Sequence, residues 1–139
     1  MLLLDNSAFA RLAHPSLPAG RAEEIADHIE RREIAVCLPF LLEAGYSARD
    51  AADHGLLIER LLRLPRLPVG REVDMTALRG QAELARAGHH RLPPIDLIIA
   101  AVADAHDIGV LHYDADYDLI AARTSLEFES VWLAERGSI

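Results

Sequence analysis

Short apolar runs alternate with helix-like segments along the chain, and this alternation restricts the fold more than any other feature. Residues 2–4, 34–38 and 110–112 are aliphatic or β-branched runs of strand length. The segments between them carry apolar residues at helical spacing. Alternating strands and helices build a parallel sheet with helices on both faces. We therefore expect residues 1–139 to form a single three-layer α/β/α domain around a mostly parallel sheet of four to five strands.

Cap and turn residues set the expected limits of the elements. Asp5-Asn6-Ser7 should cap a helix after the first strand, Pro39 suits the first turn of a helix, and Gly88 should end one. We expect helices over residues 21–32, 39–47, 49–64, 72–87, 93–106 and 116–123, and two weaker strands over 64–69 and 126–128.

Size and composition favour a globular intracellular protein. The chain has 139 residues, of which 51% are hydrophobic, enough for a real core. Its longest wholly apolar run, Leu97–Ala103, is far too short to span a membrane. The apolar start meets Asp5 at once, unlike a secretory signal. The single cysteine, Cys37, has no partner for an internal disulfide, so we expect a cytoplasmic protein with no membrane contact.

Acidic residues occur where the predicted strands end and where the predicted helices begin. Asp5 and Asp114 follow strands, with Asp116 close behind, and Glu43 and Asp96 lie in the first turns of apolar helices. Ligands of parallel sheets bind beyond the carboxyl ends of the strands, and helix N-termini favour anions. One cleft could therefore receive all these carboxylates. Such an oxygen-only set suits Mg²⁺ or Mn²⁺ rather than zinc.

Each acid also has a purely structural explanation. Asp5 could cap a helix, Asp96 could complement a helix dipole, and Asp114 and Asp116 could belong to a solvated turn. Glu43 is harder to explain in this way, because it lies in an apolar stretch and a buried carboxylate needs a partner. The joint placement of the acids is what favours a metal site.

The charge of the chain bears on its partners. A formal net charge of −8 is unusual for a protein that binds nucleic acid. Two divalent cations would add four positive charges and bring it to −4. All 14 basic residues are arginines, whose guanidinium groups bind phosphate in a bidentate manner.

Other chemistries lack their motifs. The histidines show no zinc-ligand spacing, and His89 and His90 precede a Pro-Pro helix start, as expected for a solvent-facing loop. Ser7 lacks a Gly-x-Ser-x-Gly elbow, so we interpret it as a capping, metal-proximal or substrate-positioning hydroxyl. No glycine-rich phosphate loop is present. With three Phe, three Tyr and one Trp, a base-stacking platform is not expected.

Four segments together resemble the PIN-domain family, and within it the small VapC-type toxins of bacterial toxin–antitoxin pairs. The resemblance covers nearly the whole chain. It rests on Leu-Asp-Asn-Ser-Ala at 4–8, Glu43 after the second strand, Arg-Leu-Pro-Pro-Ile-Asp-Leu-Ile-Ile-Ala-Ala at 91–101, and Val-Leu-His-Tyr-Asp-Ala-Asp-Tyr-Asp at 110–118. Asn6 stands where Thr or Ser is frequent, His112 where Thr is frequent, and Tyr117 where Phe is commoner. These differences leave the acids intact and concern the fine geometry of the site.

The resemblance implies a Mg²⁺- or Mn²⁺-dependent endoribonuclease that acts as the toxin of a toxin–antitoxin pair. Its catalytic residues would be Asp5, Glu43, Asp96 and Asp114, and its metal ligands Asp5, Asp96, Asp114 and Asp116. Ser7 would help to position the substrate. The resemblance also implies a homodimer and a cognate VapB-type antitoxin. The antitoxin's amphipathic segment would lie in a groove, and the helices at 39–47 and 49–64 are candidate walls of that groove.

Three other functions fit parts of the pattern. A phosphatase of the haloacid-dehalogenase type needs a second acid two residues after Asp5, where this chain has Ser7. A phospho-receiver domain needs a late lysine, and the chain has none. A catalytically silent PIN fold that only binds protein is the remaining alternative, and the complete acid set argues against it.

Overall fold

The computed structural model describes residues 1–139 and is built around a parallel sheet of five strands in the order β3-β2-β1-β4-β5. Every neighbouring pair is parallel. The predicted α/β fold with a parallel sheet is therefore confirmed. The strands are β1 (Leu2–Leu4), β2 (Ile34–Cys37), β3 (Arg66–Leu67), β4 (Gly109–His112) and β5 (Ser130–Trp132).

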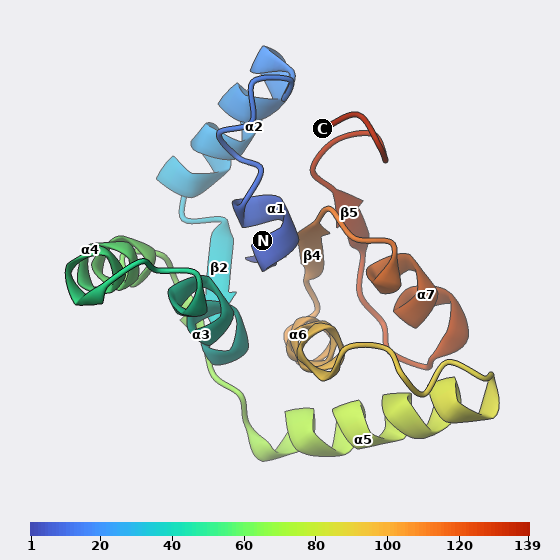
Figure 1. The fold of residues 1–139 in the computed structure, drawn as a ribbon. Helices are drawn as coiled ribbons and strands as arrows, with labels where there is room; N and C mark the ends of the chain where they lie inside the picture. Colours follow the sequence, from blue (N-terminus) through green and yellow to red (C-terminus); the bar gives the residue numbers. More distant parts are fainter.

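Seven helices connect these strands (Figure 1). Most begin and end within two or three residues of the predicted limits. The helices are α1 (Asn6–Phe9), α2 (Ala19–Glu30), α3 (Leu38–Tyr46), α4 (Ala51–Leu61), α5 (Arg71–Arg86), α6 (Pro94–Ala105) and α7 (Asp116–Arg123).

The last strand was predicted at the wrong place. We expected it over residues 126–128, but the pairing with β4 uses Ser130–Trp132. Leu126 is buried because it packs over Gly80 of α5, where an added Cβ would lie 2.9 Å from Leu126 Cδ1. The Glu127 N–H donates to Asp104 Oδ1 at 2.8 Å instead of to a neighbouring strand. Helix packing thus takes up the apolar segment that resembled a strand.

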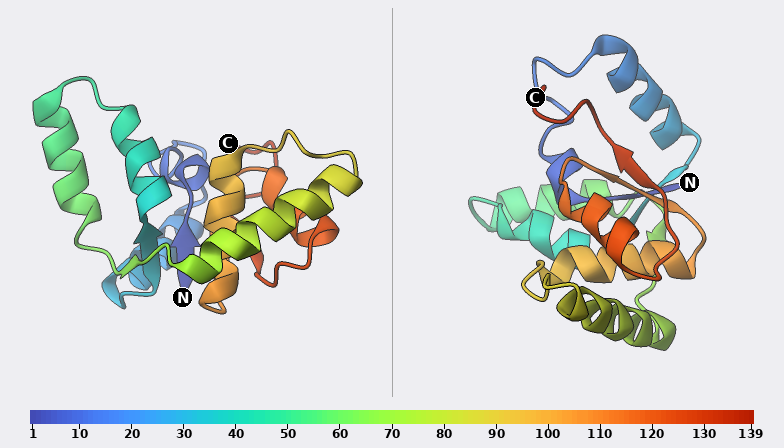
Figure 2. Two further views of the ribbon diagram at one scale, coloured as in Figure 1. Left: turned by 90° about the horizontal axis from the view of Figure 1, so that it is seen from below. Right: turned by 90° about the vertical axis from the view of Figure 1, so that its right-hand side faces the viewer.

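Helices cover the sheet on both sides (Figure 1). Helix α2 lies on one side, and α6 lies on the other, against β1 and β4, with seven of its residues buried. Helix α5 crosses the outside of α6 (Figure 2). In the chain, α6 comes after β3 and before β4, and it runs in the direction opposite to the strands. Its N-terminus therefore lies at the edge where the parallel strands end. The fold therefore gathers Asp5, Asp96 and Asp114 at one edge.

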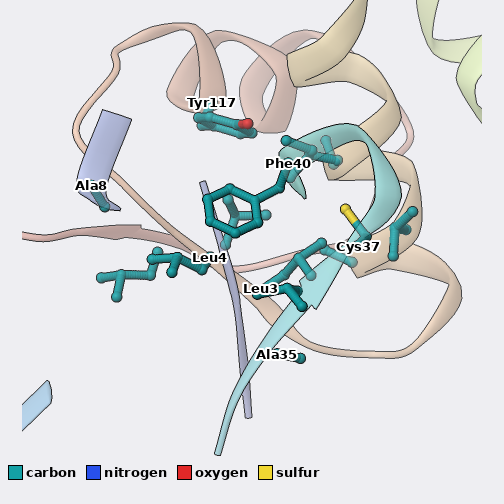
Figure 3. Close-up of a cluster of buried hydrophobic side chains, with 14 of the residues drawn as sticks. Leu3, Leu4, Ala8, Ala35, Cys37, Phe40 and Tyr117 are labelled. Atoms are coloured by element: carbon teal, nitrogen blue, oxygen red, sulfur yellow. The ribbon is translucent and has the colours of Figure 1, made fainter. Parts of the chain in front are cut away.

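The core directly beneath this edge is dense and apolar. Phe40 of α3 and Tyr117 of α7 are its largest fully buried side chains, and they lie close to Leu3 and Leu4 of β1 (Figure 3). The phenolic oxygen of Tyr117 is a polar atom inside this apolar cluster, so it needs a partner in the site. None of the helices combines the length and the apolar composition that a membrane span requires.

Candidate metal centre

Only three polar or charged residues of the chain are buried, and all three belong to the same edge of the sheet. They are Asp5 at 3% exposure, Asp96 at 8% and His112 at 0%. Buried carboxylates are costly unless they are paired or bound to a cation. Their coincidence at one edge is therefore a strong indication of a functional site.

Asp5 is held rigidly where β1 ends. Its backbone N–H donates to the Leu111 carbonyl at 3.0 Å, so the ladder with β4 continues to this residue. Asp5 Oδ2 accepts from the Ser7 N–H at 2.8 Å and from the Ser7 hydroxyl. Asp5 Oδ1 accepts from the Tyr117 hydroxyl at 2.7 Å. Asp5 thus caps α1, as its structural explanation predicted, while its carboxylate also faces the other acids.

Asp96, Asp114 and Asp116 form the tightest group of acids. Each offers one carboxylate oxygen, and the three oxygens lie within 4.8 Å of one another. Asp96 comes from the first turn of α6, whereas Asp114 and Asp116 come from the loop after β4 and the start of α7. The Asp116 N–H donates to Asp114 Oδ1 at 3.0 Å, which fixes the spacing of these two residues.

The electrostatics of Asp96 show how closely the acids crowd. Burial, followed by the negative charges of Asp5, Asp114, Asp116 and Glu43, raises the pKa of Asp96 to about 8. Burial and Asp114 also raise the pKa of Asp116. Without a cation, these carboxyls cannot all ionise at neutral pH.

Glu43 faces the same cluster from α3 and is only half-buried. Burial, and then the charge of Asp5, raises its pKa. Glu43 does not belong to the group whose oxygens lie within 4.8 Å of one another. The structure therefore brings Glu43 near Asp5 and Asp96 but leaves it at the side of the three aspartates.

The cluster has no counter-charge from the protein. None of the six ion pairs in the structure involves Asp5, Glu43, Asp96, Asp114 or Asp116. Several buried or half-buried carboxylates that form no ion pair fit a divalent cation that prefers oxygen ligands. The carboxylate oxygens of these residues are the ligands that the protein offers to a metal ion.

Ser7 lies between Asp5 and the loop that carries the other acids. Its hydroxyl donates to Asp5 Oδ2 and accepts the Tyr113 N–H at 2.9 Å. Both contacts are internal, so Ser7 joins the end of β1 to the loop after β4. The predicted substrate-positioning role of Ser7 stays a prediction, and its observed contacts are those of a residue that holds Asp5.

A chain of hydrogen bonds behind the loop was not predicted from the sequence. The Asp114 N–H donates to His112 Nδ1 at 3.1 Å, and His112 Nε2 lies 2.7 Å from Ser130 Oγ. The Ser130 hydroxyl in turn donates to Asp118 Oδ1 at 2.6 Å. Burial lowers the pKa of His112, consistent with a neutral ring that accepts at Nδ1 and donates at Nε2.

Comparison with known proteins identifies the family of this chain. Residues 2–123 match the PIN domain family. The chain belongs to the PIN-domain family. The matched residues include all five acids of the site: Asp5, Glu43, Asp96, Asp114 and Asp116.

Relatives with similar sequences lie within the VapC-type branch of the PIN-domain family. The chain is 37% identical to Ribonuclease VapC18 of Mycobacterium tuberculosis, over 98% of this chain and 97% of that protein. It is 41% identical to Ribonuclease VapC21 of the same species, over 98% and 96%. The predicted membership of the VapC-type branch is confirmed.

Solved structures show the same PIN fold. DNA-bound VapBC from Salmonella typhimurium superimposes with a TM-score of 0.72, at 20% identity, over 96% of this chain and 100% of that chain. VapBC-5 from Mycobacterium tuberculosis gives 0.64, at 24% identity, over 94% and 98%.

Two departures from the family pattern now have a structural explanation. Tyr117 stands where Phe is commoner, and its hydroxyl donates to Asp5. His112 stands where Thr is frequent, and its ring joins Asp114 to Ser130. The unusual residue types at positions 117 and 112 were therefore the feature of the sequence that could have indicated these two contacts. Ser130 and Asp118 gave no comparable signal, because their partners are 18 and 12 residues away.

Proposed function

We propose that this PIN-domain protein is a metal-dependent endoribonuclease and the toxin of a toxin–antitoxin pair. The observation that carries the proposal is the group formed by Asp96, Asp114 and Asp116, whose oxygens lie within 4.8 Å of one another beside buried Asp5. Relatives at 37% and 41% identity are named ribonucleases, which supports RNA as the substrate. A cytoplasmic location is part of the same proposal, because cellular RNA would be the substrate.

The metal would be held by Asp96, Asp114 and Asp116, with Asp5 beside them. When bound, Mg²⁺ or Mn²⁺ supplies a cationic centre that acidifies water and offsets the charge of the phosphate. The protein's part is to hold its carboxylates in place. Asp5 is fixed by Ser7 and Tyr117 and contributes its negative charge to the centre.

Glu43 has a separate role in this proposal. It lies at the side of the cluster, is half-exposed and has a raised pKa. A glutamate whose pKa is raised by burial and by a neighbouring carboxylate keeps its proton more readily than an ordinary glutamate, and it can donate that proton to the leaving oxygen of a cleaved phosphodiester. We therefore assign Glu43 to proton transfer and the four aspartates to the metal centre.

The surface between α3 and α4 is the proposed antitoxin groove. It forms a cavity of about 490 Å³ whose apolar lining includes Leu38, Leu42 and Tyr46. These three side chains are exposed and lie four residues apart along one face of α3. This face and the VapBC neighbours support a VapB-type partner with an amphipathic segment. A homodimer is part of the same proposal.

The decisive experiment is cleavage of RNA by the purified chain. We expect cleavage in Mg²⁺ or Mn²⁺, loss of cleavage with a chelator, and at least a hundredfold lower rate for Asp96→Asn. Asp27→Asn is the matched control, because Asp27 is exposed on α2, on the other side of the sheet. Wild-type cleavage rates in Asp96→Asn would refute the site. No cleavage by the wild type, with the groove still binding antitoxin, would favour a silent protein-binding module.

A further inference from the structure

A second recess opens directly beside the metal centre. It has a volume of about 290 Å³ and is lined by residues 88–93, by Asp116 and by Leu119. Residues 88–93 form the connection between α5 and α6, which we call the HHR loop after His89, His90 and Arg91. This connection passes beside α7 (Figure 1). Because Asp116 belongs both to the metal centre and to this recess, the two are continuous.

The HHR loop is held at both ends. Gly88 ends α5 with a φ of +83°, a conformation that glycine adopts without steric cost. The His89 N–H donates back to the Leu84 carbonyl at 2.7 Å, and the Leu92 N–H donates to the His89 carbonyl at 3.3 Å. Pro93 and Pro94 then begin α6. One guanidinium and two imidazole side chains are therefore presented from a short backbone segment that is held at both ends.

Arg91 has no partner within the protein. It is exposed, and it takes part in none of the side-chain hydrogen bonds or ion pairs of the structure, even though Asp116 lines the same recess. Arg11 is the contrasting case, because its guanidinium donates to the Ser7 carbonyl at 2.9 Å and covers the Tyr113 ring. Arg91 is thus the arginine beside the metal centre whose donors are free.

We propose that the HHR loop is a phosphate-binding subsite for the RNA strand next to the cleaved bond. The proposal rests on the proposed nuclease function. The carboxylates of the centre repel the flanking phosphates of a substrate, so a cation beside them is needed to hold the strand. The Arg91 guanidinium matches a phosphate in a bidentate manner. The imidazoles of His89 and His90 add N–H donors along the same recess.

Salt dependence of RNA binding tests this subsite. Binding of a short single-stranded RNA would be measured in Mg²⁺ with Asp96→Asn as the non-cleaving background. Each phosphate contact on a single strand contributes about −0.7 to the slope of log K against log salt concentration. Arg91→Ala should make that negative slope shallower by about 0.7 and weaken binding roughly threefold to tenfold. Arg91→Lys should keep most of the slope while losing the bidentate contact.

Arg60→Ala is the matched control. Arg60 is also exposed and unpaired, but it lies on α4, remote from the HHR loop (Figure 1). An unchanged slope in Arg91→Ala, or an equal change in Arg60→Ala, would overturn the subsite, as would an absence of RNA binding. In the cleaving background, Arg91→Ala should raise KM with kcat nearly unchanged. If the wild type cleaves RNA but Arg91→Ala has the wild-type slope, only the subsite fails. If the wild type does not cleave, the proposed function itself fails.

Discussion

Asp96 is buried among other carboxylates, so the cost of ionising it is a property of the folded chain. Its pKa in the unfolded chain is near 3.8 and rises to about 8 on folding. Between these values the folded state keeps a proton that the unfolded state has released. A carboxyl with a raised pKa therefore contributes stability that is present below about pH 4 and is lost as the pH rises toward 8.

The stability of the metal-free protein should therefore decrease as Asp96 loses its proton. In the presence of a chelator, the melting temperature of the wild type should fall between pH 4 and pH 8, whereas Asp96→Asn should show a smaller fall, because an amide has no proton to lose. At pH 8 the variant should melt higher by about 5 °C or more. Adding Mg²⁺ should then raise the melting temperature of the wild type but not that of the variant. Thermal unfolding followed by circular dichroism measures both effects, and parallel curves for the two proteins would contradict the prediction.

The positions of the acidic residues could be predicted from the sequence, but their hydrogen-bond partners could not. The acids were predictable because each follows a strand or begins a helix, positions that a parallel sheet brings to one edge. Their precise neighbours were not, because Tyr117 meets Asp5 across 112 positions of sequence. Only the three-dimensional packing of α7 against α5, α6 and β5 decides that this hydroxyl, rather than water, binds the carboxylate.

Elements behave differently from residues, because their limits depend on packing as well as on local sequence. Helix α7 was predicted with its exact limits, since its acidic first turn and Arg123 suit the helix dipole. The strand predicted at residues 126–128 was misplaced, since Leu126 is used to fill the space above Gly80. An apolar run of three residues does not distinguish these two kinds of burial.

Ser130 of β5 is linked through His112 to the loop that carries Asp114, so its hydroxyl should affect both stability and metal binding. Ser130→Ala removes the partner of His112 Nε2 and leaves a buried N–H without an acceptor. We expect a loss of about 1–3 kcal/mol in unfolding free energy and weaker Mg²⁺ binding, because the His112 ring also holds the Asp114 backbone.

Calorimetric titration with Mg²⁺ and thermal unfolding measure these changes. Ser130→Thr keeps the hydroxyl and should retain most of the metal affinity. Ser16→Ala, which removes an exposed hydroxyl, should change neither quantity. Equal Mg²⁺ affinity in Ser130→Ala and the wild type would show that the loop holds its shape without the His112 contact.

At the scale of the whole molecule, the metal centre and the apolar groove occupy different parts of the fold. The acids gather at the carboxyl edge around α6 and α7, whereas α4 lies at the opposite end of the molecule from α7 (Figure 2). Helix α3 belongs to both regions, since it carries Glu43 as well as Leu42. A ligand in the groove could therefore affect the cleft without touching the three aspartates.

This separation allows inhibition and catalysis to be uncoupled by one substitution. Leu42 is 65% exposed in the groove, so Leu42→Glu should leave the fold and RNA cleavage close to those of the wild type. The same charge would be buried against the apolar segment of an antitoxin, where an unpaired carboxylate is costly. We expect at least a tenfold weaker complex on co-purification and size-exclusion chromatography, and arrested growth even when antitoxin is co-expressed. Leu56→Glu is the control, because Leu56 is 57% exposed on α4 but does not line the groove. If both variants bind antitoxin as tightly as the wild type, the partner contacts another face, and the exposed stripe of α3 then needs a different explanation.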